Sequence, residues 1–179
     1  MLEIRGRKIK SLYDAEQLAV RNDELALEIA KRGQKDLLVI AVLKGSFIFA
    51  ADLVRSLHKA GLTPEVEFIS LSSYGAGTES SGTVKIVRDI ESDVVGRNVL
   101  LIDDILESGR TLAYAKKLMK DRKAASVEIA VLLDKKGKRV ADINAEYVGF
   151  ECPDYFVVGY GMDVGHAFRE LPFVGIVQE

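Results

Sequence analysis

The sequence predicts an α/β fold in which helices flank a mostly parallel sheet. Runs of β-branched residues and leucine recur along the chain, as in residues 37–43, and such continuous apolar runs are typical of parallel strands buried on both faces. Segments with helical periodicity stand between these runs, as in residues 14–32. Because strand and helix alternate, we expect helices on both faces of one sheet. The length of 179 residues predicts a single domain, residues 1–179.

The first half of the chain begins with the predicted helix at 14–32, which ends near Gly33. Three of its apolar residues fall on one stripe, as required for packing on a sheet: Leu18, Leu25 and Ile29. The apolar run at 37–43 is predicted to be a buried strand. A helix is then expected at 47–61, followed by a strand at 65–73.

Residues 74–83 are polar and rich in glycine, and they predict a loop. The alternating residues 84–90 predict a strand, and residues 98–105 predict another buried strand. A helix at 111–122 and a strand at 126–135 continue the alternation. Three short apolar segments close the chain: 147–153, 155–163 and 173–179.

Ligands of parallel α/β sheets bind beyond the carboxyl ends of the strands. That rule places four loops on one rim of the predicted sheet: 44–46, 72–82, 103–111 and 134–139.

The composition is that of an ordinary globular protein, with 48% apolar and 29% charged residues. The net charge is −2, and no block of Lys and Arg exceeds three residues, so neither a nucleic-acid nor a membrane partner is expected. The single cysteine, Cys152, fits a reducing compartment. The amino-terminal residues contain no apolar run typical of a signal peptide, and no window predicts a membrane helix. We therefore expect a cytoplasmic protein.

The stretch "LLIDDILESGRTL", residues 100–112, places two acids directly after a buried strand. Acids there can simply mark the point where a chain leaves the core, but two adjacent carboxylates repel each other and favour a cation or hydroxyl donors nearby. The turn that follows opens a helix, whose free N–H groups favour an anion. A phosphorylated sugar suits both features, with the phosphate on the turn and the ribose hydroxyls or Mg²⁺ on the acids.

Other phosphate-binding motifs do not fit. The chain has no G-x-x-x-x-G-K-[ST] sequence. The stretch "GAGTES", residues 75–80, half-matches a dinucleotide fingerprint but lacks the third glycine and a following helix, so we interpret it as a flexible loop.

"VLLIDDILESGRTL" resembles the phosphoribosyl-pyrophosphate motif of the type I phosphoribosyltransferases. Other segments resemble, in order and spacing, those of the hypoxanthine-guanine phosphoribosyltransferases: "VLKGSFIFAADL", "LSSYGAGTESSG", "LLDK", "YVGFECPDYFVVGYGMD" and "FRELPFVGIV". The resemblance extends over residues 37–177. It implies the type I phosphoribosyltransferase fold, with a small hood formed by the chain ends.

The resemblance assigns the sugar-phosphate contacts to one segment. Asp103 and Asp104 would face the ribose hydroxyls and the metal shell. Glu107 would exchange a proton with purine N7 as the catalytic residue, although the family norm at this position is Asp. Glu is one methylene longer than Asp and has a similar unperturbed pKa; the alternative is that Glu107 only supports the loop. Four residues would bind the 5′-phosphate: Ser108, Gly109, Arg110 and Thr111.

The pyrophosphate contacts implied by the resemblance are Lys44, Gly45 and Arg169, with a cis peptide bond preceding Lys44. Asp163 would be a Mg²⁺ ligand. Ser73 and Tyr74 would begin a mobile loop that closes over the site.

The purine contacts implied by the resemblance are Lys135, Phe156 and Val157. Lys135 would donate to the exocyclic O6, and because an ammonium can only donate, it would disfavour the amino group of adenine. Three basic neighbours are interpreted instead as a solvated face: Lys136, Lys138 and Arg139.

The predicted function is purine salvage: transfer of ribose 5-phosphate from phosphoribosyl pyrophosphate to hypoxanthine or guanine, with Mg²⁺, by a homodimer or homotetramer. Two alternatives stay open. One is a regulator of the same fold that senses a nucleotide and binds nucleic acid, which would carry a basic face. The other is an enzyme that prefers xanthine and differs only around the purine.

Overall fold

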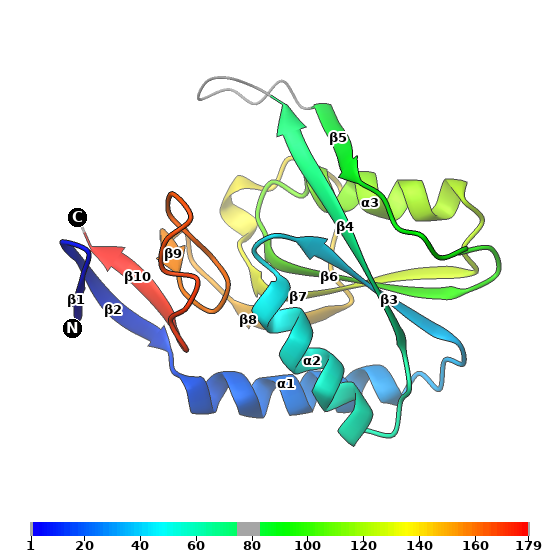
Figure 1. Ribbon diagram of the computed structural model, residues 1–179, viewed down its shortest axis with the longest axis horizontal. Coiled ribbons are helices and arrows are strands. Elements are labelled where there is room, and N and C mark those ends of the chain that lie inside the picture. Colours follow the sequence, from blue (N-terminus) through cyan, green and yellow to red (C-terminus); the bar gives the residue numbers. More distant parts are fainter. Residues whose placement is uncertain (1, 75–82, 179) are drawn as a thin grey trace.

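The computed structural model describes residues 2–74 and 83–178. It confirms the predicted α/β fold: helices pack on both faces of a six-stranded sheet, in the order β5-β4-β3-β6-β7-β8 (Figure 1). The strands of this main sheet are β3 (Leu37–Leu43), β4 (Glu65–Tyr74), β5 (Thr83–Arg88), β6 (Asn98–Leu106), β7 (Ser126–Asp134) and β8 (Tyr147–Glu151). The helices are α1 (Ala15–Ala30), α2 (Phe47–Lys59) and α3 (Arg110–Asp121), and a short 3-10 helix, η1, spans Lys136–Lys138.

Five of the six strands run parallel, and only β5 is antiparallel, at the edge next to β4. Strand β3 lies in the middle and is buried from Leu37 to Val42, because both of its faces are covered. Successive side chains of a strand point to opposite faces, so Leu38 and Ile40 pack on the side of α3, whereas Val39 and Ala41 pack on the side of α1 and α2. The continuous apolar runs of the sequence follow from this double burial.

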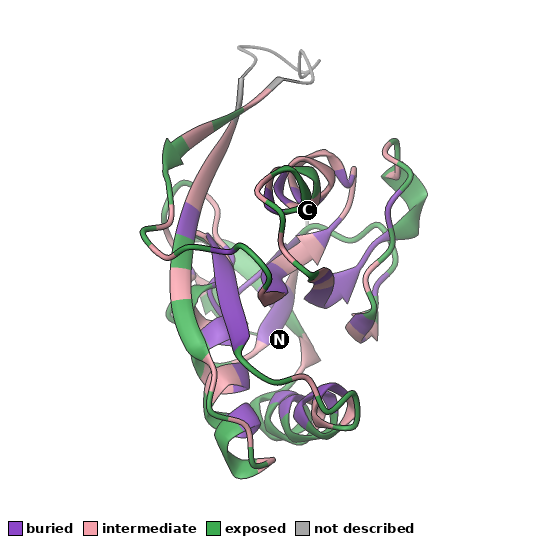
Figure 2. Ribbon diagram, turned by 90° about the vertical axis from the view of Figure 1, so that its right-hand side faces the viewer, coloured by how far each residue is buried: buried purple, intermediate pink, exposed green. Residues whose placement is uncertain are grey.

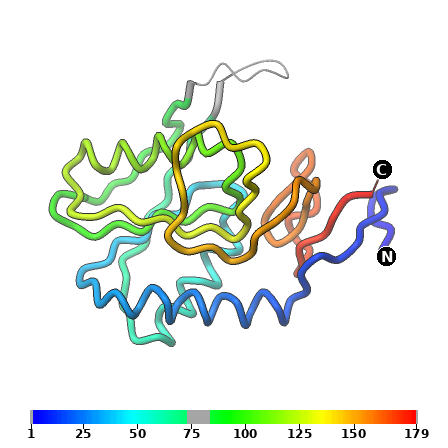
Figure 3. The backbone as a smooth tube through the Cα atoms, turned by 180° about the vertical axis from the view of Figure 1, so that it is seen from behind, coloured from blue at the N-terminus to red at the C-terminus, as the bar shows by residue number. Residues whose placement is uncertain are grey.

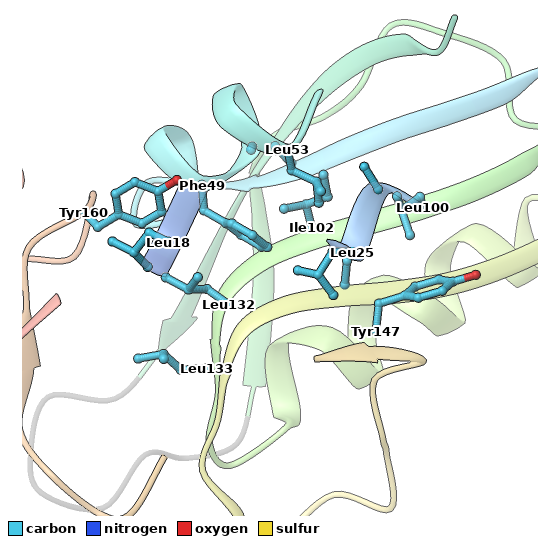
Figure 4. Close-up of a cluster of buried hydrophobic side chains, with 14 of the residues drawn as sticks. Leu18, Leu25, Phe49, Leu53, Leu100, Ile102, Leu132, Leu133, Tyr147 and Tyr160 are labelled. Atoms are coloured by element: carbon cyan, nitrogen blue, oxygen red, sulfur yellow. The ribbon is translucent and has the colours of Figure 1, made fainter. Parts of the chain in front are cut away.

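The larger core lies between the sheet and the helix pair α1 and α2. Figure 4 shows side chains from both helices gathered around side chains of the sheet. The contributing residues include Leu18, Leu25, Phe49, Leu53, Leu100, Ile102 and Leu132. Figure 2 shows the same arrangement across the molecule, with buried residues on the inner strands and on the helix faces turned toward them.

Helix α1 begins where the sequence predicts. The Asp14 side chain accepts a hydrogen bond from the Gln17 backbone N–H (2.9 Å), and the Gln17 side chain accepts one from the Asp14 N–H (3.0 Å). This reciprocal capping box satisfies two backbone donors that the first turn of a helix leaves unpaired.

The chain ends form a second sheet, in the order β1-β2-β10-β9, as the resemblance implies for the hood. Its strands are β1 (Leu2–Ile4), β2 (Arg7–Tyr13), β9 (Val157–Val158) and β10 (Val174–Gln178). Figure 3 shows the amino-terminal and carboxy-terminal strands side by side at one end of the molecule. The hood has its own small apolar cluster, formed by Ile9, Val158, Phe168 and Leu171. No described helix is long and apolar enough to cross a membrane.

Candidate active site

A cavity of about 270 Å³ opens at the carboxyl ends of β3 and β6, on the rim that the strand order predicts. The last residues of these two strands and the segments that follow them form most of its lining. The cavity therefore brings together eight of the predicted site residues: Lys44, Gly45, Asp103, Asp104, Glu107, Ser108, Gly109 and Thr111.

The loop after β3 approaches the acids very closely. The peptide bond between Leu43 and Lys44 is cis, as the resemblance implies. A Cβ atom on Gly45 would lie 1.9 Å from the Asp104 Oδ2 atom, which is far inside van der Waals contact. On the other side, a Cβ atom on Gly161 would lie 2.3 Å from the Gly45 carbonyl oxygen. Glycine at positions 45 and 161 lets Asp104, the loop after β3 and the segment around Gly161 lie in close contact.

The two acids are held in an unfavourable environment for charge. The Asp103 carboxylate accepts a hydrogen bond from the Asp104 N–H (2.9 Å), and the Asp104 carboxylate accepts one from the Ile105 N–H (2.9 Å). Burial, and then the neighbouring Asp104 charge, raise the pKa of Asp103 well above its usual value. Burial also raises the pKa of Asp104, although hydrogen bonds and the positive charge of Arg169 act in the opposite direction. Such a pair favours a cation or hydroxyl donors beside it.

The turn between β6 and α3 has the shape of an anion-binding loop. Gly109 adopts φ +80°, a left-handed conformation, directly before the first residue of α3. The Ser108 hydroxyl oxygen accepts a hydrogen bond from the Arg110 N–H (3.4 Å). The first turn of a helix presents N–H groups without helical partners, and the helix dipole adds positive potential there. The turn can therefore bind a phosphate.

The predicted purine contacts come from two further segments. Lys135 follows β7 and is buried; its ammonium donates to the Tyr155 carbonyl oxygen (2.6 Å) and lies 3.6 Å from Glu107 Oε1. Phe156, next along the chain, is 57% exposed, and Val157 is buried in β9. The exposed aromatic ring of Phe156, one residue after the Lys135 partner Tyr155, offers a surface on which a flat heterocycle could stack.

Arg169 and Asp163 lie at the hood side of the site. Arg169 donates to the Gly161 carbonyl oxygen (2.6 Å) and forms an ion pair with Asp163 (2.8 Å). Asp163 also accepts a hydrogen bond from the His166 N–H (2.7 Å). Because Gly161 packs on Gly45, the bond from Arg169 to Gly161 connects the arginine to the loop after β3.

Apart from Ser73 and Tyr74, six of the predicted residues do not line the cavity itself: Arg110, Lys135, Phe156, Val157, Asp163 and Arg169. Within the described ranges 2–74 and 83–178, no three Asp, Glu, His or Cys side chains are grouped to hold a metal ion.

Ser73 and Tyr74 end β4, where they pair with Val84 and Thr83 of β5. The rest of the predicted loop, including the stretch 75–80, lies outside the described residues.

The interpretation of Arg139 as part of a solvated face is wrong. Its side chain is only 15% exposed and forms an ion pair with Asp134, which is itself buried. Lys136 and Lys138 do lie on the surface, where they pair with acidic residues. The sequence signal that was missed is an acid and an arginine five residues apart on the predicted rim, which is not distinctive among neighbouring basic residues.

A larger cavity, of about 520 Å³, lies between α1, α2 and the hood. Four of its charged side chains form two ion pairs, Asp52 with Arg55 and Asp23 with Lys59, and the predicted residue Arg169 also lines it. It contains neither the acid pair nor the anion-binding turn, so size alone does not identify the site of the chemistry.

Comparison with known proteins agrees with this geometry. The phosphoribosyl transferase domain family matches residues 8–164. The hypoxanthine-guanine phosphoribosyltransferase of Aquifex aeolicus is 45% identical over 181 residues, with 100% of both chains covered. Two solved structures of hypoxanthine phosphoribosyltransferases are also similar. That from Staphylococcus aureus has a TM-score of 0.89 and 40% identity, covering 94% of this chain and 91% of that one. That from Trypanosoma cruzi has a TM-score of 0.91 and 36% identity, covering 99% and 95%. The chain belongs to the phosphoribosyl transferase family, in which these relatives are hypoxanthine or hypoxanthine-guanine phosphoribosyltransferases.

Proposed function

We propose that this protein is a purine salvage enzyme, which transfers ribose 5-phosphate from phosphoribosyl pyrophosphate to hypoxanthine or guanine and releases pyrophosphate. The observation that carries the proposal is one cavity in which an anion-binding turn, the adjacent acids Asp103 and Asp104, and Glu107 meet. These are the groups required by a phosphate, a ribose and a base that are joined in one nucleotide product.

The 5′-phosphate is assigned to the turn before α3. The backbone N–H groups of this turn, together with two hydroxyl groups, would donate to the phosphate oxygens, and the helix dipole favours the negative charge. The four residues of this subsite are Ser108, Gly109, Arg110 and Thr111. The left-handed conformation of Gly109 supports this role, because it allows the chain to turn under the phosphate.

Asp103 and Asp104 are assigned to the ribose, whose two hydroxyl groups would donate to the carboxylate oxygens. Mg²⁺ is assigned to the same oxygens, with Asp163 as a further ligand. Because these three acids are not grouped in the described residues, substrate phosphates would supply much of its coordination, as is usual for this ion. The raised pKa values of Asp103 and Asp104 support the assignment, since a nearby cation or donor would stabilise their charged forms. Bound Mg²⁺ would offset negative charge on the departing pyrophosphate.

Lys44, Gly45 and Arg169 are assigned to the pyrophosphate. The ammonium and the guanidinium would balance the charge that develops as the bond to ribose C1 breaks. The backbone of Gly45 would donate from a position directly beside Asp104, whose carboxylate a Cβ on residue 45 would displace. Ser73 and Tyr74 are assigned to the start of a loop that closes over the site and excludes water from the oxocarbenium-like transition state.

Lys135, Phe156 and Val157 are assigned to the purine. The Lys135 ammonium would donate to O6 of a 6-oxopurine, the Phe156 ring would stack on the base, and Val157 would contact it through its backbone. Since an ammonium has donors but no acceptor, this site would reject the amino group of adenine.

Glu107 is assigned the proton at N7. When N9 of the base bonds to ribose C1, the purine becomes more acidic, and the Glu107 carboxylate would accept the N7 proton. In the reverse reaction the same carboxyl would return it. The distance of 3.6 Å between Glu107 and Lys135 supports this role, because it brings the acid to the place assigned to the base.

We further propose that residues 1–179 act as one domain in the cytoplasm, with no nucleic-acid or membrane partner, and that the chain forms a homodimer or homotetramer. Exposed apolar side chains on neighbouring strands support self-association: Val66 and Phe68 on β4 and Val87 on β5. Light scattering coupled to gel filtration tests this proposal, and a single-chain mass at micromolar concentration would contradict it.

The test of the proposed activity is a set of initial rates with phosphoribosyl pyrophosphate, Mg²⁺ and five bases: hypoxanthine, guanine, xanthine, adenine and uracil. Turnover of hypoxanthine or guanine, with adenine and uracil inert, is expected. Fast turnover of xanthine alone would move the assignment to a xanthine enzyme. Binding of a nucleotide without turnover of any base would favour the regulator.

A further inference from the structure

Three consecutive carbonyl groups of the site loop are bound by one short segment of the chain. The Leu106 oxygen accepts from Arg139 Nη2 (3.1 Å) and also from the Lys135 N–H (2.9 Å), and the Glu107 oxygen accepts from Arg139 Nε (2.9 Å). The Ser108 oxygen accepts from the backbone N–H groups of residues 140 and 141, each at 3.0 Å. We call residues 139–141 the clamp. No other described segment binds all three of these carbonyl groups.

The Arg139 side chain donates hydrogen bonds to four acceptors. Besides the two loop carbonyls, it donates to the Ile143 carbonyl oxygen (2.7 Å) and to the Asp134 carboxylate. A guanidinium carries five N–H donors in a rigid planar fork, so it can reach several acceptors in fixed directions at once. A lysine ammonium in the same place could keep the ion pair with Asp134, but it could not span both loop carbonyls.

The clamp controls the opposite side of the loop through peptide geometry. A trans peptide unit is planar, and its C=O and N–H groups point in opposite directions. Each of these carbonyl groups shares a peptide unit with the N–H of the following residue. Fixing the carbonyl groups of residues 106–108 therefore aims the N–H groups of residues 107–109 away from the clamp. Residues 106–109 line the cavity, so the clamp sets how these donors and the Glu107 side chain face the substrate.

The loop and the clamp are in direct contact. A Cβ atom on Gly109 would lie 2.6 Å from Ile143 Cγ2 and 3.0 Å from Arg139 Cδ. Arg139 itself does not line the cavity. It also lies four residues after Lys135, so the assigned purine contact and the clamp belong to one short segment.

We infer that Arg139 is a positioning residue, which aims the phosphate-binding amides and the Glu107 carboxylate by holding the carbonyl groups behind them. This inference rests on the proposed function of the site and deepens it. Arg139 touches neither substrate nor reacting atoms; it acts through the loop.

Arg139→Lys is the decisive variant, because it keeps the charge beside Asp134 while removing the fork. We expect the KM for phosphoribosyl pyrophosphate to rise at least 10-fold and kcat to fall at least 10-fold, with the melting temperature nearly unchanged. Lys138→Met is the matched control, because Lys138 is exposed and forms an ion pair with Asp154 at the surface. Its kinetic constants should stay within 2-fold of those of the wild type.

Rescue by a small molecule separates positioning from general stability. In Arg139→Ala, guanidinium chloride at tens of millimolar should restore activity several-fold, while equal concentrations of NaCl or urea should not. Rescue would require the guanidinium to occupy the vacated place between Asp134 and the loop carbonyls. If Arg139→Lys had wild-type constants, or if activity fell only in proportion to the unfolded fraction with no rescue, the inference would be overturned.

Calorimetric binding of ribose 5-phosphate keeps this test independent of the proposed activity. Even if the wild type turned over none of the bases, the clamp predicts that Arg139→Lys binds ribose 5-phosphate at least 10-fold more weakly than the wild type and Lys138→Met do. Equal affinity in all three proteins would refute the role of Arg139, whereas loss of turnover in the wild type would refute only the activity.

Discussion

The Lys135 ammonium lies 3.6 Å from Glu107 Oε1, so the two groups assigned to the neighbouring O6 and N7 atoms of the purine pair with each other. The Lys135 side chain is 8% exposed and that of Glu107 is 41% exposed. Lys135 is also held by the Tyr155 carbonyl oxygen (2.6 Å), whereas Glu107 has more freedom. Entry of a base therefore has to displace the Glu107 side chain rather than the lysine.

Glu107→Gln should lower kcat by about 10-fold or more, because the amide cannot accept the N7 proton. The KM for phosphoribosyl pyrophosphate should change little, since the phosphate-binding turn is untouched. Steady-state kinetics with hypoxanthine would measure both. Glu107→Asp is the control and should retain most activity. Unchanged turnover in Glu107→Gln would remove this residue from the catalytic role.

Lys135→Met should raise the KM for hypoxanthine and guanine by about 10-fold or more and weaken discrimination against adenine, because the only assigned donor to O6 is lost. Competition between hypoxanthine and adenine measures this directly. Lys136→Met provides the control, since Lys136 is exposed and pairs with Glu151 at the surface. A variant that still excluded adenine as well as the wild type does would place base selection elsewhere.

Gly45→Ala should reduce kcat/KM by about 100-fold, because the new methyl group would displace the Asp104 carboxylate from the cavity. The side chain of Asp104 can move, so the fold should survive. Gly137→Ala is the matched control: a Cβ there meets no atom within 4 Å. Equal activity of the two variants would show that the close approach of Gly45 to Asp104 has no functional role.

Asp103→Asn should abolish most activity yet stabilise the fold in the absence of Mg²⁺. Burial and the Asp104 charge raise the pKa of Asp103 in the folded state, so the folded protein binds a proton more tightly than the unfolded chain does. The wild type therefore loses stability as the pH rises above 3.8, the ordinary pKa of an Asp carboxyl. The Asp103→Asn variant does not, because its amide does not titrate. At pH 7 the variant should therefore be more stable than the wild type.

Urea unfolding of both proteins at several pH values would measure this difference. The gain should vanish below pH 3.8, where the carboxyl is neutral in both states. A gain that persisted unchanged at low pH would mean that charge burial is not its cause.

Tyr147→Phe should lose less stability at alkaline pH than the wild type does, because phenylalanine has no proton to release. Burial and the hydrogen bond to Glu128 (2.8 Å) raise the pKa of Tyr147 from 10.0 to about 12. The unfolded phenol loses its proton first, so this contribution is fully present below pH 10.0 and is lost as the pH rises to about 12. The stability difference between wild type and variant should shrink by roughly 2 kcal/mol over that window. A constant difference would contradict the prediction.

The elements and the anion-binding turn could be predicted because their signals are local. A strand buried on both faces needs a continuous apolar run, and residues 37–43 have one. A turn that opens a helix needs glycine and hydroxyl residues close together, and residues 103–111 have them. These local requirements, with the family motifs, determined the α/β fold, the rim that carries the site and the residues Asp103, Asp104 and Glu107.

Only the tertiary structure decided which distant groups meet. Arg139 is one basic residue among neighbours in the sequence, yet its partners Leu106 and Glu107 lie more than 30 residues earlier. The contact of Gly45 with Asp104 likewise depends on how β3 and β6 align. Packing selects these partners because burying a guanidinium or a carboxylate is favourable only where fixed donors and acceptors surround it, and sequence spacing does not encode that geometry.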